Sequence, residues 1–121
     1  MMGENERLVV IRHAPYSSNQ LREGLDVALV AAAFGHTVSV LFLGQGVLAL
    51  VKGQTTGAPG QKATLPTIHM LEMYDIDNLL VPAEALQALN LSKDQLVEGV
   101  TAISSSELPS LFQRYASVLN F

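Results

Sequence analysis

The sequence contains no cysteine among its 121 residues. Disulfides, thiolate metal sites and any cysteine nucleophile or sulfur-carrying thiol are therefore excluded in this chain. Long apolar runs are also missing, because Gly, Asn, Asp or Glu interrupts each one before the ~18 residues that a membrane-spanning helix needs. We therefore expect no membrane span.

Positive charge is scarce as well. Seven Lys and Arg stand against 11 Asp and Glu, which gives a net charge of −4, and no basic stripe with interleaved aromatics is present. This pattern argues against direct nucleic-acid binding. Charged residues make up only 15% of the chain and hydrophobic residues 49%, so we expect part of the surface to be covered by a partner subunit.

The length predicts one domain, residues 1–121. The segment 1–6 is short and acidic, which is unlike a signal peptide. We expect it to form a disordered tail, and we expect the protein to be cytoplasmic.

Strand and helix patterns alternate along the chain. Apolar runs predict strands and periodic segments predict helices. The predicted strands are 8–11, 37–43, 78–81 and 100–103; the predicted helices are 21–34, 47–51, a third from Thr64, 83–88, a short one at 92–98 and 108–119. Such alternation predicts a three-layer α/β/α fold around a mainly parallel sheet of four to five strands.

Several local signals support these bounds. Ser18 or Asn19 can cap the first long helix, and Gly35 can end it. Ser92 and Gln95 have the spacing of a capping box. Gly24 lies inside the first long helix at a cost of up to ~1 kcal/mol relative to Ala, which predicts a close approach of another group there.

The pair Arg12-His13 directly follows the first strand, as in the histidine phosphatases, whose histidine becomes phosphorylated. That chemistry needs more cationic residues around the phosphate and usually a second histidine. The other histidines, His36 and His69, do not follow predicted strands. A small hydrolase using His13 remains an alternative hypothesis, against the commoner case of a histidine that packs at a strand end.

Two other patterns have plain structural explanations. Gly44-x-Gly46 lacks the third glycine of a dinucleotide loop, because Ala49 stands there. Ser17 and Ser18 could be nucleophiles beside His13, but helix capping is far commoner. A nucleotide-binding module at the first loop is a third hypothesis. No complete catalytic, cofactor or metal site can be assembled from the sequence.

Several stretches resemble the DsrE/DsrF-type sulfur-relay family, and its TusC-like (DsrF-like) branch is the nearest match. The stretches are Ala14 to Ser18, Arg22 to Leu29, Gly46-Val47 with the short helix after it, Tyr74 to Ile76, and Tyr115 to Phe121. They span nearly the whole chain in order.

The resemblance implies a cytoplasmic heterohexamer in which this chain joins a cysteine-bearing DsrE-like paralogue and a DsrH-like paralogue. Such complexes pass persulfide sulfur between carrier proteins, for 2-thiouridine at the tRNA wobble base or for sulfur oxidation. The reactive cysteine of the carrier subunit corresponds to the stretch Val81-Pro82-Ala83, which holds no thiol. The implied role is a non-catalytic subunit without cofactor or metal.

The same resemblance indicates a partner interface around the first loop and helix. Its candidate residues are Tyr16, Ser17, Arg22, Glu23 and Asp26. In this interpretation the chain is not an enzyme by itself, and the sulfur chemistry belongs to a neighbouring subunit.

Overall fold

The computed structural model describes residues 6–14, 19–52, 65–76 and 78–121. Its strands are β1 (Glu6–Ile11), β2 (Thr37–Phe42), β3 (Asn78–Pro82), β4 (Val100–Ile103) and β5 (Ser117–Asn120). Its α-helices are α1 (Gln20–Ala33), α2 (Leu65–Met73), α3 (Ala83–Ala88) and α4 (Leu108–Gln113). The 3-10 helices are η1 (Gly44–Leu50), η2 (Lys93–Gln95) and η3 (Ser105–Glu107).

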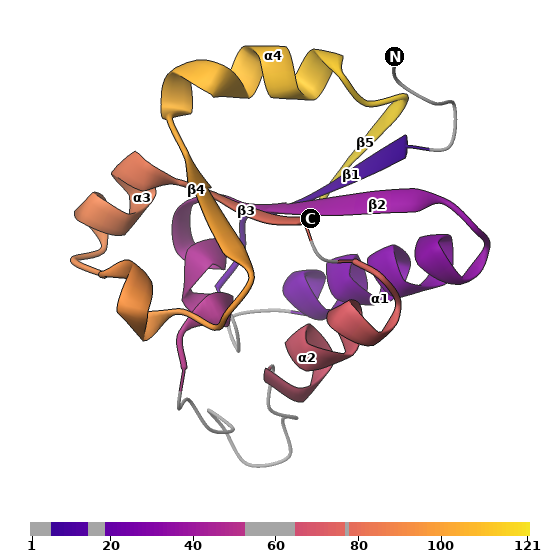
Figure 1. Cartoon of the computed structure of the whole chain (residues 1–121), viewed down its shortest axis with the longest axis horizontal. Coiled ribbons are helices and arrows are strands. Elements are labelled where there is room, and N and C mark those ends of the chain that lie inside the picture. Colours follow the sequence, from indigo (N-terminus) through magenta and orange to yellow (C-terminus); the bar gives the residue numbers. More distant parts are fainter. Residues whose placement is uncertain (1–5, 15–18, 53–64, 77) are drawn as a thin grey trace.

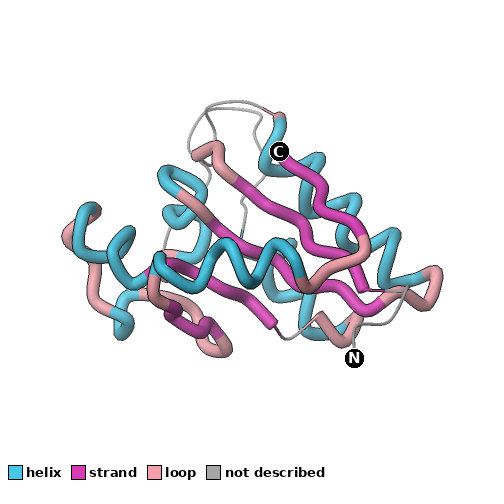
Figure 2. The backbone as a smooth tube through the Cα atoms, turned by 90° about the horizontal axis from the view of Figure 1, so that it is seen from above, coloured by secondary structure: helices cyan, strands magenta, loops and turns pink. Residues whose placement is uncertain are grey.

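All five strands form one parallel sheet in the order β4-β3-β2-β1-β5. Figure 2 shows the strands side by side between helices. The central strands are the most apolar, and Leu8–Ile11 of β1 are fully buried. This is the pattern of a parallel sheet covered on both faces, and the predicted three-layer α/β/α fold is confirmed.

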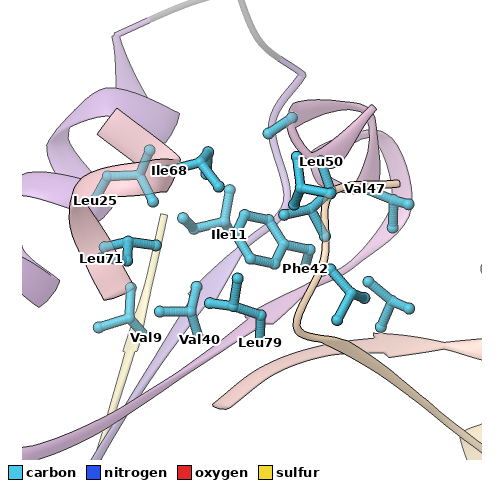
Figure 3. Close-up of a cluster of buried hydrophobic side chains, with 14 of the residues drawn as sticks. Val9, Ile11, Leu25, Val40, Phe42, Val47, Leu50, Ile68, Leu71 and Leu79 are labelled. Atoms are coloured by element: carbon cyan, nitrogen blue, oxygen red, sulfur yellow. The ribbon is translucent and has the colours of Figure 1, made fainter. Parts of the chain in front are cut away.

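The two faces of the sheet carry unequal cores. One face packs against α1, α2 and η1, and the other is covered mainly by α4 (Figure 1). Figure 3 shows the larger core, in which Ile11 and Phe42 lie between the helices and the sheet. Leu25, Ile68 and Leu71 meet them from α1 and α2.

The predicted helix over 108–119 is wrong in its second half. The helix α4 ends at Gln113, and residues 117–120 form β5 beside β1. The pairing continues past the strand, since the Phe121 N–H donates to the Val10 carbonyl oxygen at 2.8 Å. The backbone bonds that β1 offers at its outer side outweigh the local helical periodicity of this segment.

Smaller differences concern the helix ends. The predicted helix 47–51 is instead η1, which begins at Gly44. Asn19 does occupy the N-cap position of α1, but its side chain makes no capping hydrogen bond. Met70 on α2 is 41% exposed. The capping box of Ser92 and Gln95 is present, although the helix it begins is η2.

The glycine inside α1 is explained by the last residue of the chain. A Cβ added to Gly24 would lie 3.0 Å from Cγ of Phe121, whose ring rests on the helix at that point. The predicted close approach at Gly24 is therefore confirmed, and the approaching group is an aromatic ring from beyond β5. Gly35 has φ +90°, which fits its predicted place after α1.

In the described part of the chain, no helix is long and apolar enough to cross a membrane. The cap candidate Ser18, residues 1–5 of the predicted tail and Thr64, where a helix is predicted to begin, lie outside the described residues.

Candidate functional site

The carboxyl ends of the strands are the first place to look for a site, because ligands of parallel sheets bind there. Arg12 and His13 follow β1 and are both exposed. The Arg12 side chain donates to Oδ1 of Asn120 from Nε at 3.4 Å and from Nη2 at 3.3 Å. Arg12 thus links the ends of β1 and β5.

The three histidines do not come together. His13 lies at the carboxyl end of the sheet, whereas His36 precedes β2 at the amino end and His69 is exposed on α2. The residues described contain no group of three His, Asp or Glu side chains able to hold a metal. The arrangement does not favour the phosphohydrolase hypothesis, because no second histidine accompanies His13.

The Gly44-x-Gly46 turn packs against backbone. A Cβ on Gly46 would collide with the carbonyl oxygen of Ile11, and Gly44 has φ +51°. Both glycines are needed to turn the chain from β2 into η1. The pair therefore serves the fold.

The stretch Val81-Pro82-Ala83 lies where β3 passes into α3. Val81 and Pro82 are buried, and Ala83 is half-buried. The next residue, Glu84, is exposed and accepts a hydrogen bond on Oε1 from the backbone N–H of Ser105 at 3.0 Å. This carboxylate joins the ends of the neighbouring strands β3 and β4, directly after the stretch that the resemblance matches to the thiol of carrier subunits.

The hydrogen bond from the Ser105 backbone lowers the pKa of Glu84 below its usual value of 4.5. A lowered pKa in the folded state contributes stability above about pH 4.5, and this contribution is lost as the pH falls through the folded pKa.

We expect Glu84→Gln to be less stable than the wild type at pH 7, and the difference to vanish in acid. Urea unfolding between pH 3 and 7 measures this, with Glu72→Gln on α2 as the control for losing an exposed carboxylate. A difference that persisted unchanged in acid would contradict the assignment.

The candidate interface residues are only partly covered by the structure. Tyr16 and Ser17 lie outside the described residues. On α1, Arg22 is half-buried, while Glu23 and Asp26 are exposed. The structure places these three on the first half of one helix.

The sequence did not indicate a groove of about 420 Å³ between α1 and β5, called here the α1–β5 groove. Its apolar lining consists of Val27, Val30, Ala31, Phe34 and Leu119. Arg7, Asp26 and His36 also line it. In the structure Val30 and Phe34 are apolar residues on the exposed side of α1. Apolar residues on the outer side of a helix are the sequence signal that could have indicated this groove.

Comparison with known proteins places the chain among relatives. Residues 7–121 match the DsrE/DsrF-like family. The chain is 34% identical over 112 residues to the TusC homologue of Pseudomonas aeruginosa, covering 93% of this chain and 94% of that protein. It is 37% identical over 109 residues to the intracellular sulfur oxidation protein DsrF of Allochromatium vinosum, covering 90% and 79%.

The fold is also that of a solved structure. The crystal structure of the ychN protein from E. coli superposes with a TM-score of 0.84 at 19% identity, covering 96% of this chain and 98% of that one. A family match over nearly the whole chain and relatives above 30% identity agree with the observed topology. The chain belongs to the DsrE/DsrF-like family.

Proposed function

We propose that this chain is a non-catalytic subunit of a cytoplasmic sulfur-relay complex that passes persulfide sulfur between carrier proteins. Membership of the DsrE/DsrF-like family and the names of the TusC and DsrF relatives support the pathway. One observation carries the subunit role: the chain has no cysteine. A persulfide requires a thiol, so the sulfur must travel on another subunit.

The partners in this proposal are a cysteine-bearing DsrE-like paralogue and a DsrH-like paralogue, arranged as a heterohexamer. The amino-terminal half of α1, with Arg22, Glu23 and Asp26, and the preceding Tyr16 and Ser17 form the proposed contact surface. The two exposed carboxylates support this choice, because charged groups at the rim of an interface steer association.

Co-expression of the tagged chain with both paralogues from the same genome tests the proposal. We expect all three chains to co-elute, and we expect persulfide on the paralogue's cysteine by mass spectrometry. The double variant Glu23→Lys, Asp26→Lys should weaken co-elution, whereas Glu72→Lys, an exposed site on α2, should not. A chain that elutes without the paralogues would contradict the subunit role.

The end product of the relay is proposed to be 2-thiouridine at the tRNA wobble base, which is what the resemblance to the TusC-like branch implies. The 37% identity to DsrF favours sulfur oxidation as the second candidate. Deleting the gene separates the two. Loss of 2-thiouridine from digested tRNA supports thiolation, and unchanged tRNA with impaired oxidation of reduced sulfur supports the second candidate.

A further inference from the structure

Phe121 is fixed to the sheet by both of its backbone groups. Its N–H donates to the Val10 oxygen, and its oxygen accepts from the Arg12 N–H, each at 2.8 Å. The residue before it is tied to the same strand end, because the Arg12 side chain donates to Oδ1 of Asn120. The backbone from which the Phe121 side chain departs is therefore held by β1.

The side chain of Phe121 leaves the sheet on the side of α1. Neighbouring residues of a strand point to opposite faces. Val118 packs in the smaller core under α4, whereas Leu119 lines the α1–β5 groove and Phe121 packs against the larger core. There the Phe121 side chain meets α1 at Gly24, which is buried.

The contact is made by the base of the side chain as well as by the ring. A Cβ at Gly24 would lie 3.0 Å from Cγ of Phe121 and 3.1 Å from its Cβ and Cδ2. Cβ and Cγ cannot swing aside while the backbone of Phe121 stays bonded to β1 on both sides. The bare backbone at Gly24 lets α1 come down onto this side chain. Phe121 therefore sets how closely the first turns of α1 approach the sheet.

The outer side of the same turns carries the proposed contact residues. Glu23 and Asp26 flank Gly24 on α1, and both are exposed. Two residues along a helix turn by about 200°, so Asp26 lies on the side of α1 away from Phe121. Arg22 is half-buried in the same turn. A change in how Gly24 rests on Phe121 moves the turn that carries all three side chains.

We propose that Phe121 is a positioning residue for the partner-binding face of α1. It holds the helix so that Arg22, Glu23 and Asp26 meet the cysteine-bearing paralogue in one fixed geometry. A surface that is ordered before association loses less conformational entropy on binding, so it binds more tightly. This inference rests on the proposed function, since it takes these three residues to contact that paralogue.

Hydrogen exchange of the full chain alone tests the positioning. Phe121→Ala keeps the two backbone bonds to β1 but loses the ring, so the amides of residues 24–28 in α1 should exchange about tenfold faster. Phe121→Leu keeps a carbon at Cγ and should stay near the wild type. Phe112→Ala is the matched control, because it removes another half-buried phenylalanine ring, from the core under α4. It should leave exchange in α1 unchanged.

Titration with the purified cysteine-bearing paralogue tests the consequence for binding. The Kd of Phe121→Ala should rise more than about tenfold, whereas Phe121→Leu and Phe112→Ala should bind as the wild type does. Gly24→Ala should also weaken binding, because its Cβ pushes α1 away from Phe121. Alanine is the better helix former, so lost helicity would not be the cause. Adding Phe121→Ala to Gly24→Ala should restore part of the affinity, since Cγ and Cδ2 no longer oppose the new Cβ.

Three results would overturn the inference. They are a Phe121→Ala variant that binds the paralogue as tightly as the wild type, exchange in α1 that does not respond to this substitution, and a Phe112→Ala variant that loses the same affinity. A wild type that does not bind the paralogue would overturn the subunit role, and this inference with it. The two failures are distinct, because the wild type is titrated before any variant.

Discussion

Replacing Gly46 with Ala should destabilise the fold by about 3 kcal/mol or more. The added Cβ would collide with the carbonyl oxygen of Ile11 and lie 2.9 Å from its carbonyl carbon. These are backbone atoms of a fully buried strand, and the same oxygen already accepts from the N–H of Leu43 at 2.9 Å. The clash can be relieved only by moving η1 away from β1. Urea unfolding followed by circular dichroism measures the loss.

Gly44→Ala is the matched control, because it adds the same methyl group two residues earlier. No atom lies within 4 Å of a Cβ at Gly44, but its φ is +51°. The substitution should therefore cost only the left-handed backbone strain of an alanine, about 1–2 kcal/mol. If the two variants lost equal stability, the collision at Ile11 would not be the cause.

These glycines also show how a short motif misleads when it is separated from its contacts. Gly44-x-Gly46 follows a strand and opens a helix, as phosphate-binding loops do. Its second glycine is required because η1 packs directly on the end of β1. A motif of two glycines cannot distinguish backbone packing from ligand approach, whereas the neighbouring backbone atoms can.

The central sheet could be predicted because its strands are short apolar runs bounded by turn signals. The last strand could not. Leu108, Leu111, Phe112, Tyr115 and Val118 have helical spacing, and all of them do pack in one core cluster. The periodicity thus identified the buried face correctly but not the backbone conformation. Leu119, which lines the groove on the opposite face, is the residue that a continuous helix does not explain.

The one feature of the candidate site that could be predicted from the sequence is its lack of a thiol, because the presence or absence of cysteine needs no knowledge of the fold. The absence of a thiol at Val81-Pro82-Ala83 is visible in the sequence, and it determines the proposed role. The α1–β5 groove was not predictable, because it is formed by a strand that pairs with β1 across more than a hundred residues of chain. Glu84 was also missed, since its hydrogen bond to Ser105 depends on the adjacency of β3 and β4.

Phe42→Ala should cost about 3–5 kcal/mol of stability. Phe42 is fully buried on the face of the sheet that packs against α1, α2 and η1 (Figure 3), and among the described residues it is the largest fully buried side chain. Its removal leaves a cavity among elements whose backbones are held by the sheet, so the site cannot collapse fully.

Met73→Ala is the control, because it also shortens a large apolar side chain. Met73 is 81% exposed, so this substitution should change the free energy of unfolding by less than about 0.5 kcal/mol. Urea midpoints of the two variants give the comparison, and equal midpoints would mean that the core on this face does not hold the fold together.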